Sequence, residues 1–95
     1  MAKTFLVTYS YPTDMLERRQ PHRAEHLAHL QRGVEEGKLV FAAAFTDPVD
    51  GAVLLVEADD AGDIVSWVGS DPYARAGLIR GVGVRELTVA ARRSL

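Results

Sequence analysis

The order in which apolar residues change their spacing is the feature that most constrains the fold of this chain. Alternation with a period of two indicates strands, and recurrence every three or four residues indicates helices. The two spacings follow one another in the order strand, helix, strand, strand, helix, strand. The predicted segments are the strand 3–9, the helix 16–36, the strands 39–45 and 52–56, the helix 59–69 and the strand 82–89. This order predicts an α+β fold in which a four-stranded antiparallel sheet carries both helices on one face.

The predicted boundaries depend on residues that start or stop regular structure. Pro21 divides the first helical segment into a short lead-in and a main helix, which Gly37 ends. Asp59 and Asp60 are candidate N-caps of the second helix. The apolar residues of the last strand change parity midway, which predicts a β-bulge near Arg85–Glu86. The complete order, βαββαβ, is that of a ferredoxin-like fold.

The two middle strands carry apolar residues on both faces. In the segments 39–45 and 52–56, Val, Leu, Ala and Phe occupy positions of either parity. The sheet face away from the helices would therefore expose a large apolar patch, and such patches mark interfaces. Two sheets packed face to face would cover this patch and form a dimeric α+β barrel, whereas loops or the C-terminal tail are the alternative cover. We expect a homodimer through the sheet face.

The composition limits the classes of function. A chain of 95 residues with 47% hydrophobic and 25% charged residues is expected to fold as one domain, 1–95. The absence of cysteine excludes disulfides, thiolate metal ligands and a cysteine nucleophile. Without a signal peptide or an apolar run of about 20 residues, we expect a cytoplasmic protein with no membrane partner. A net charge of −2 with scattered Lys and Arg predicts no nucleic-acid partner.

Three histidines, His22, His26 and His29, fall in the first helical segment. The apolar stripe of this helix consists of Leu27, Leu30 and Val34. On a helical wheel His22 and His29 point away from the stripe, so we expect them on the solvated surface, and only His26 lies at its edge. Without an H-E-x-x-H pattern or cysteine, we predict no metal site. His26 is then either a functional group or a half-buried histidine bonded to a backbone carbonyl.

Arg23 lies four residues before Leu27 and therefore on the apolar line of the helix. Burying an unpaired guanidinium costs several kcal/mol. Arg23 should therefore meet a carboxylate or bind an anionic ligand, unless its side chain reaches water from the first turn.

The segment from Asp71 to Gly77 permits two interpretations. Locally, Asp71 caps a short helical turn, Pro72 takes the first helical position and Gly77 ends the turn. In the functional interpretation Asp71 reaches His26 and fixes its tautomer for acid/base work. The two roles are compatible. The chain has no glycine-rich phosphate loop, and we predict no nucleotide or other cofactor.

Several segments resemble the YCII (YciI-like) family in order and spacing. They are R-A-E-H-L-A-H-L at 23–30, E-G-K-L at 36–39, D-P-Y at 71–73 and A-G-L at 76–78. The resemblance implies a ferredoxin-like dimeric α+β barrel with His26 and Asp71 as the catalytic pair. It further implies that Arg23 and Tyr73 line the same cleft and bind substrate. Many members have Gly-Pro where this chain has Ala43–Ala44, which implies a differently shaped pocket wall.

The resemblance also implies an activity. One branch of the family is similar to muconolactone-isomerase-like enzymes and includes a dehydrochlorinase that acts on a chlorinated hydroxyhydroquinone in aromatic degradation. We therefore expect a cofactor-independent lyase or isomerase for a small aromatic or enolic substrate, with His26 as general acid/base. Arg23 and Tyr73 would steady the developing oxyanion. The alternatives are a non-catalytic module that binds a small anion through Arg23 and His26, and a dimeric scaffold.

Overall fold

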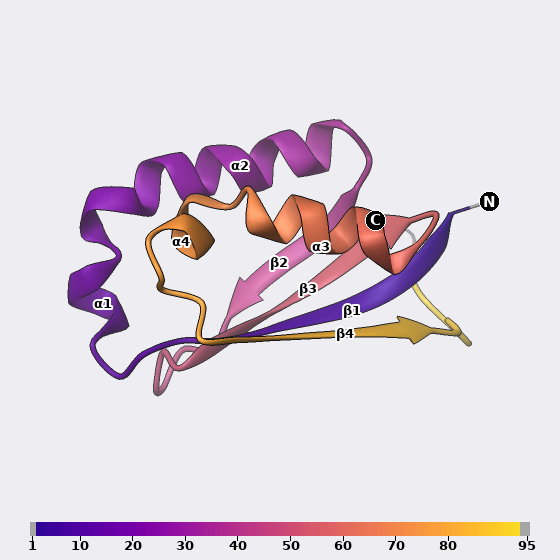
Figure 1. Cartoon of the computed structure of the whole chain (residues 1–95). Helices are drawn as coiled ribbons and strands as arrows, with labels where there is room; N and C mark the ends of the chain where they lie inside the picture. The colour runs from indigo at the N-terminus through magenta and orange to yellow at the C-terminus, as the bar shows by residue number, and fades with distance from the viewer. Residues whose placement is uncertain (1, 94–95) are drawn as a thin grey trace.

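The helices and strands come from a computed structural model that describes residues 2–93. Its elements are β1 (Lys3–Ser10), α1 (Met15–Arg18), the 3₁₀ helix η1 (Gln20–His22), α2 (Arg23–Glu35), β2 (Leu39–Ala44), β3 (Gly51–Ala58), α3 (Ala61–Gly69), α4 (Pro72–Arg75) and β4 (Gly81–Leu87). Figure 1 shows this order along the chain. The outermost residues of the predicted domain, Met1, Ser94 and Leu95, lie outside the described residues.

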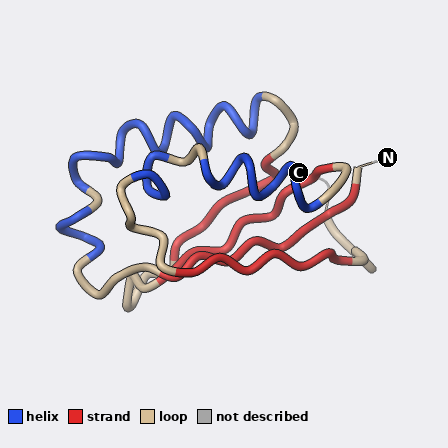
Figure 2. The backbone as a smooth tube through the Cα atoms, in the orientation of Figure 1, coloured by secondary structure: helices blue, strands red, loops and turns tan. Residues whose placement is uncertain are grey.

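The strands form one antiparallel sheet in the order β2-β3-β1-β4. Figure 2 shows the helices together on one side of this sheet. The predicted α+β fold of the ferredoxin-like type is therefore confirmed. Within residues 2–93, no helix combines the length and the apolar character needed to cross a membrane.

The main core lies between the sheet and the helices. It is built largely from alternate residues of β1 and one face of α3, namely Phe5, Val7, Tyr9, Ile64, Trp67 and Val68. Burying one such apolar side chain contributes roughly 1.5–3 kcal/mol. A smaller cluster of Met15, Tyr73 and Leu78 joins the region of α1 to α4. Tyr11 packs against both clusters, so the end of β1 is held between them.

The predicted start and stop signals are confirmed. Pro21 lies in η1, which separates the short α1 from the main helix α2. Gly37 follows α2 with a φ of 77°, the left-handed conformation that favours glycine. The side chain of Asp60 caps α3 by accepting a hydrogen bond from the backbone N–H of Asp63 at 3.0 Å.

The prediction that His29 lies on the solvated side of α2 is wrong. His29 is 6% exposed and stacks on Trp67, with 4.7 Å between ring centroids. Leu27, on the predicted core stripe, is 47% exposed. The reason lies at Gly33, where an added Cβ would stand 3.0 Å from the indole ring. Because Gly33 has no side chain, α2 approaches Trp67 closely and turns its histidine face inward.

The predicted bulge near Arg85–Glu86 is also wrong. β4 pairs with β1 in one unbroken register from Gly81 to Leu87. Val84 shares the helix side of the sheet with the core residues of β1, whereas Leu87 lies on the opposite side. The change of parity therefore reflects two apolar faces and not an inserted residue. A register shift is found instead in β2, just before Phe41.

The sheet face opposite the helices is rich in apolar side chains. By register, this open face carries Leu6, Phe41, Val53, Leu55 and Leu87. Leu6 and Leu55 lie directly opposite each other on the two central strands. Phe41 and Leu87 are exposed in the chain taken alone. A face of this kind is typical of an interface.

Candidate active site

His26 and Asp71 meet at the end of the helical layer. His26 lies in the first turn of α2, and Asp71 is the residue immediately before α4. The Nδ1 atom of His26 is 2.7 Å from Oδ1 of Asp71, although the two residues are 45 positions apart. The carboxylate of Asp71, at the N-terminus of the short α4, reaches His26 on α2.

Asp71 makes both of the contacts that the sequence analysis considered for it. Its Oδ1 accepts one hydrogen bond from His26 and another from the backbone N–H of Tyr73, at 2.9 Å, as an N-cap. The residue is 0% exposed. An ionised carboxylate only accepts hydrogen bonds, so Nδ1 of His26 is the donor and Nε2 is the nitrogen free to face a ligand.

Tyr73 stacks on one face of the His26 imidazole and also contacts Arg23. Its ring stacks on His26 with 3.6 Å between centroids and 4° between planes. Nη1 of Arg23 donates a long hydrogen bond of 3.5 Å to the Tyr73 hydroxyl. The residues predicted from the sequence, His26, Asp71, Arg23 and Tyr73, are therefore in one contact network. The carboxylate fixes the edge of the imidazole ring and the tyrosine fixes its plane.

A pocket of about 200 Å³ opens beside this network. Its polar wall consists of Tyr9, Tyr11, Arg19, Arg23, His26 and Tyr73. Its apolar wall comes from α2, β2 and β3 and includes Ala43 and Ala44. His26 thus lies in the wall, while Asp71 is buried behind it.

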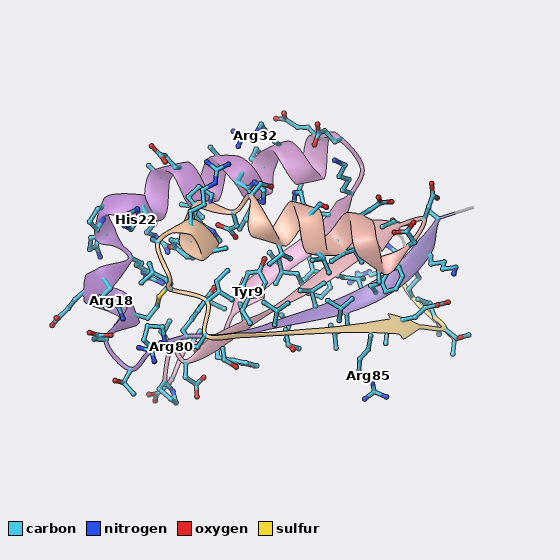
Figure 3. The ribbon with its side chains drawn as sticks, in the orientation of Figure 1. Tyr9, Arg18, His22, Arg32, Arg80 and Arg85 are labelled. Carbon is cyan, nitrogen blue, oxygen red and sulfur yellow. The ribbon has the colours of Figure 1, made fainter. Side chains whose placement is uncertain are left out.

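Sequence reasoning missed Tyr9, Tyr11 and Arg19. Figure 3 shows Tyr9 between the sheet and the helices. Burial raises the pKa of the Tyr9 hydroxyl well above its usual range, and the negative charge of Asp71 raises it further. Burial likewise raises the pKa of Tyr11, with smaller effects from Tyr73 and Asp71. Both hydroxyls therefore stay protonated as hydrogen-bond donors. The available signal was that Tyr9 has the core parity of β1, where a hydroxyl needs a partner.

The other two histidines are not part of this pocket. His22 is half-buried at the start of α2. His29 lines a separate hollow of about 520 Å³ together with Arg32, Trp67 and Arg75. Burial lowers the pKa of His29, so the neutral imidazole is favoured there. Within residues 2–93, no group of three or more His, Asp or Glu side chains is placed to hold a metal ion.

Comparison with known sequences finds one family and two curated relatives. The family is described as the YCII-related domain, and its model matches residues 3–88. Protein YciI from Escherichia coli O6:H1 is 32% identical over 81 residues, which covers 76% of this chain and 83% of the relative. Protein YciI from Shigella flexneri matches with the same identity and coverage.

Comparison with solved structures finds the same fold in several proteins. The 5-chloro-2-hydroxyhydroquinone dehydrochlorinase TftG from Burkholderia phenoliruptrix AC1100, in complex with 2,5-dihydroxybenzoquinone, matches with a TM-score of 0.78 and 24% identity over 90% of this chain and 93% of its own. Rv0793 from Mycobacterium tuberculosis matches with a TM-score of 0.58 and 18% identity over 99% of this chain and 100% of its own. At these identities the likeness establishes the fold alone.

Proposed function

The chain belongs to the YCII-related family, and on that premise we propose that it is a cofactor-independent acid/base enzyme, a lyase or isomerase acting on a small aromatic or enolic substrate. The observation that carries the proposal is the 2.7 Å contact between His26 and Asp71, with His26 in the wall of a pocket. A histidine whose second nitrogen is held by a carboxylate is a common general base. The dehydrochlorinase of similar fold suggests elimination of HCl as the reaction to test.

In this proposal each residue of the network has one task. Nε2 of His26 takes a proton from a substrate hydroxyl and returns it to a substrate carbon. Asp71 is a positioning residue that holds the donor tautomer of Nδ1. Arg23 and Tyr73 bind substrate and stabilise the oxyanion that develops as the proton leaves. In an HCl elimination from a chlorinated hydroxyhydroquinone, one hydroxyl becomes a carbonyl and the proton is delivered to the carbon that bears chlorine. Chloride then leaves with the bonding electrons as a second hydroxyl loses its proton, so the ring becomes a hydroxyquinone and no external oxidant or reductant is required.

The test is chloride release from 5-chloro-2-hydroxyhydroquinone, the substrate named for the similar dehydrochlorinase. The wild-type protein should release chloride, and His26→Gln should lower the rate by about 10²- to 10⁴-fold. His22→Gln is the matched control because His22 is outside the pocket, and it should retain the wild-type rate. Equal rates for wild type and His26→Gln would refute the assignment of the base.

A non-catalytic module that binds a small anion through Arg23 and His26 is the second candidate. It is favoured by the position of Arg23, which forms no ion pair within residues 2–93 and lines the pocket. An acid/base enzyme should change its rate between about pH 5 and 8, where imidazoles titrate. Simple anion binding should leave the ligand chemically unchanged and vary little with pH.

Three further expectations from the sequence accompany this proposal. We propose that two copies pair through the open face, since its apolar side chains then leave water. A dimer of this kind would be a dimeric α+β barrel in which each copy is one domain spanning residues 1–95. The cytoplasmic location stays a prediction that cell fractionation can check.

A further inference from the structure

Two polar atoms in the pocket wall are buried without a hydrogen-bond partner. They are Oη of Tyr9 and Nε of Arg19, and neither bonds to any atom of residues 2–93. Tyr9 is 3% exposed, and both residues line the pocket that contains His26. A buried donor left unsatisfied costs about 1–3 kcal/mol. Two such donors in one wall indicate that the pocket is built to donate hydrogen bonds to an acceptor.

The charges of the wall indicate the sign of that acceptor. Two guanidinium groups, Arg19 and Arg23, line the pocket, and none of its lining residues is acidic. The Lys and Arg side chains that form ion pairs within residues 2–93 are other ones, Arg18 and Lys38. The one carboxylate behind the wall, Asp71, accepts hydrogen bonds through Oδ1, and its Oδ2 has no hydrogen-bond partner among the described residues. Two guanidinium groups against one carboxylate leave the pocket with net positive charge.

The backbone around Arg19 is fixed on both sides. Its N–H donates to the carbonyl of Met15 at 2.9 Å, and its own carbonyl accepts from the N–H of His22 at 2.9 Å. Met15 is buried against Tyr73 in the smaller cluster, which anchors α1 beside the pocket. The backbone of Arg19 is thus tied to Met15, which packs on the tyrosine that stacks on His26.

We propose that Arg19 and Tyr9 bind the ionised oxygens of the substrate, and that the substrate is a small organic anion with two oxygens side by side. A guanidinium donates through Nε and one Nη as a planar fork, which matches a carboxylate or the adjacent oxygens of a hydroxyquinone. Tyr9 adds a third, neutral donor. This inference depends on the proposed function in one respect: it takes the bound anion to be the substrate from which His26 removes a proton.

Equilibrium binding by calorimetry tests the proposal with three probes. Benzoate represents the carboxylate, 2,5-dihydroxybenzoquinone represents the hydroxyquinone, and benzamide is the neutral counterpart of benzoate. The wild-type protein should bind at least one of the two anions more tightly than benzamide. Binding of benzoate would indicate a carboxylate ligand, and binding of 2,5-dihydroxybenzoquinone would indicate a hydroxyquinone. Failure of both anions to bind at millimolar concentration would overturn the proposal.

Variants of neighbouring arginines then assign the contact. Arg19→Gln should weaken binding of the anion by about 10- to 100-fold, as expected for charge-assisted hydrogen bonds. Arg18→Gln is the matched control because Arg18 pairs with Asp14 outside the pocket, and it should bind within about twofold of wild type. Tyr9→Phe should weaken binding by about threefold to tenfold. Equal affinity of Arg19→Gln and wild type would overturn the assignment.

Arg19→Lys guards against a folding artefact. Lysine keeps the charge and the long stem but lacks the fork, so this variant should keep the wild-type melting temperature and still lose affinity for the anion. Full affinity in Arg19→Lys would contradict binding through paired donors. Anion binding that depends on Arg19 without any turnover would refute the proposed enzyme and leave this inference intact. If the protein turns over substrate and Arg19→Gln changes neither the affinity nor the rate, this inference is refuted and the proposed enzyme is not.

Discussion

Asp71 serves the fold and the site through one oxygen atom. Its Oδ1 accepts from both the N–H of Tyr73 and the ring of His26, and the side chain is fully buried. Asparagine is also a good N-cap, whereas alanine is not. Asp71→Asn should therefore keep most of the stability, while Asp71→Ala should lose about 0.5–2 kcal/mol from the cap alone.

The same pair of variants separates positioning from stability in catalysis. Both should lower the rate of chloride release, because neither offers a carboxylate to Nδ1 of His26. Urea unfolding and initial rates would be measured on the two proteins side by side. An Asp71→Asn protein with the wild-type rate and pH profile would indicate that Asp71 is only a helix cap.

His29 should make the protein less stable in mild acid. Because burial lowers the pKa of His29, the unfolded chain binds a proton before the folded chain does as pH falls. Its contribution to stability is therefore full above the unfolded pKa, near 6.5, and is lost as pH falls toward the folded pKa.

The measurement compares the free energy of unfolding of wild type and His29→Phe at pH 7.5 and pH 5. Phenylalanine keeps an aromatic ring against Trp67 and has no titrating group. The wild type should lose more stability than the variant between the two pH values. An equal loss in both proteins would remove His29 as the cause.

At the level of the helix, Gly33 sets which face of α2 is buried. An added side chain would meet Trp67 at 3.0 Å and Leu39 at 3.2 Å. Gly33→Leu should destabilise the fold by about 1–3 kcal/mol through overpacking. Gln31→Leu, on the exposed side of the same helix, should change stability by no more than about 0.5 kcal/mol. Thermal or urea unfolding of both variants checks this, and similar effects would contradict the close packing of α2 on Trp67.

The elements show which structural signals are local. Pro21, Gly37 and Asp60 act within a few residues of themselves, and the boundaries they predicted are found in the structure. The buried face of α2 depends on the distant Trp67, so a helical wheel of α2 alone placed His29 wrongly. A glycine inside a helix is costly and often marks close packing, and Gly33 was the available clue.

Prediction of the site from the sequence was likewise limited by contacts between distant segments. His26, Arg23 and Asp71 were candidates from the sequence pattern. Tyr73 and the assignment of His26 with Asp71 as a pair came from resemblance to a family, because segments 45 residues apart carry no local signal that they touch. Tyr9 and Arg19 stand outside the segments of resemblance, and their role depends on how α1 packs beside the end of β1. Packing of this kind is decided by tertiary contacts and cannot be read from spacing.

For the whole molecule, the open face should decide the oligomeric state. Leu55 lies at the middle of this face, opposite Leu6, so Leu55→Glu would place a charge in the proposed interface. This variant should sediment as a monomer, whereas the wild type should sediment as a dimer. Val65→Glu is the control because Val65 is 62% exposed on α3, and it should stay dimeric. A monomeric wild type would contradict pairing through the sheet.

Chemical rescue shows whether His26 itself moves the proton. His26→Ala leaves a gap the size of an imidazole beside Asp71 and Tyr73, and free imidazole can enter it from the pocket. Chloride release from 5-chloro-2-hydroxyhydroquinone would be followed as imidazole is added. We predict that His26→Ala is nearly inactive alone and that its rate rises with imidazole, while the wild-type rate does not. A His26→Ala protein that keeps the wild-type rate without imidazole would contradict this prediction.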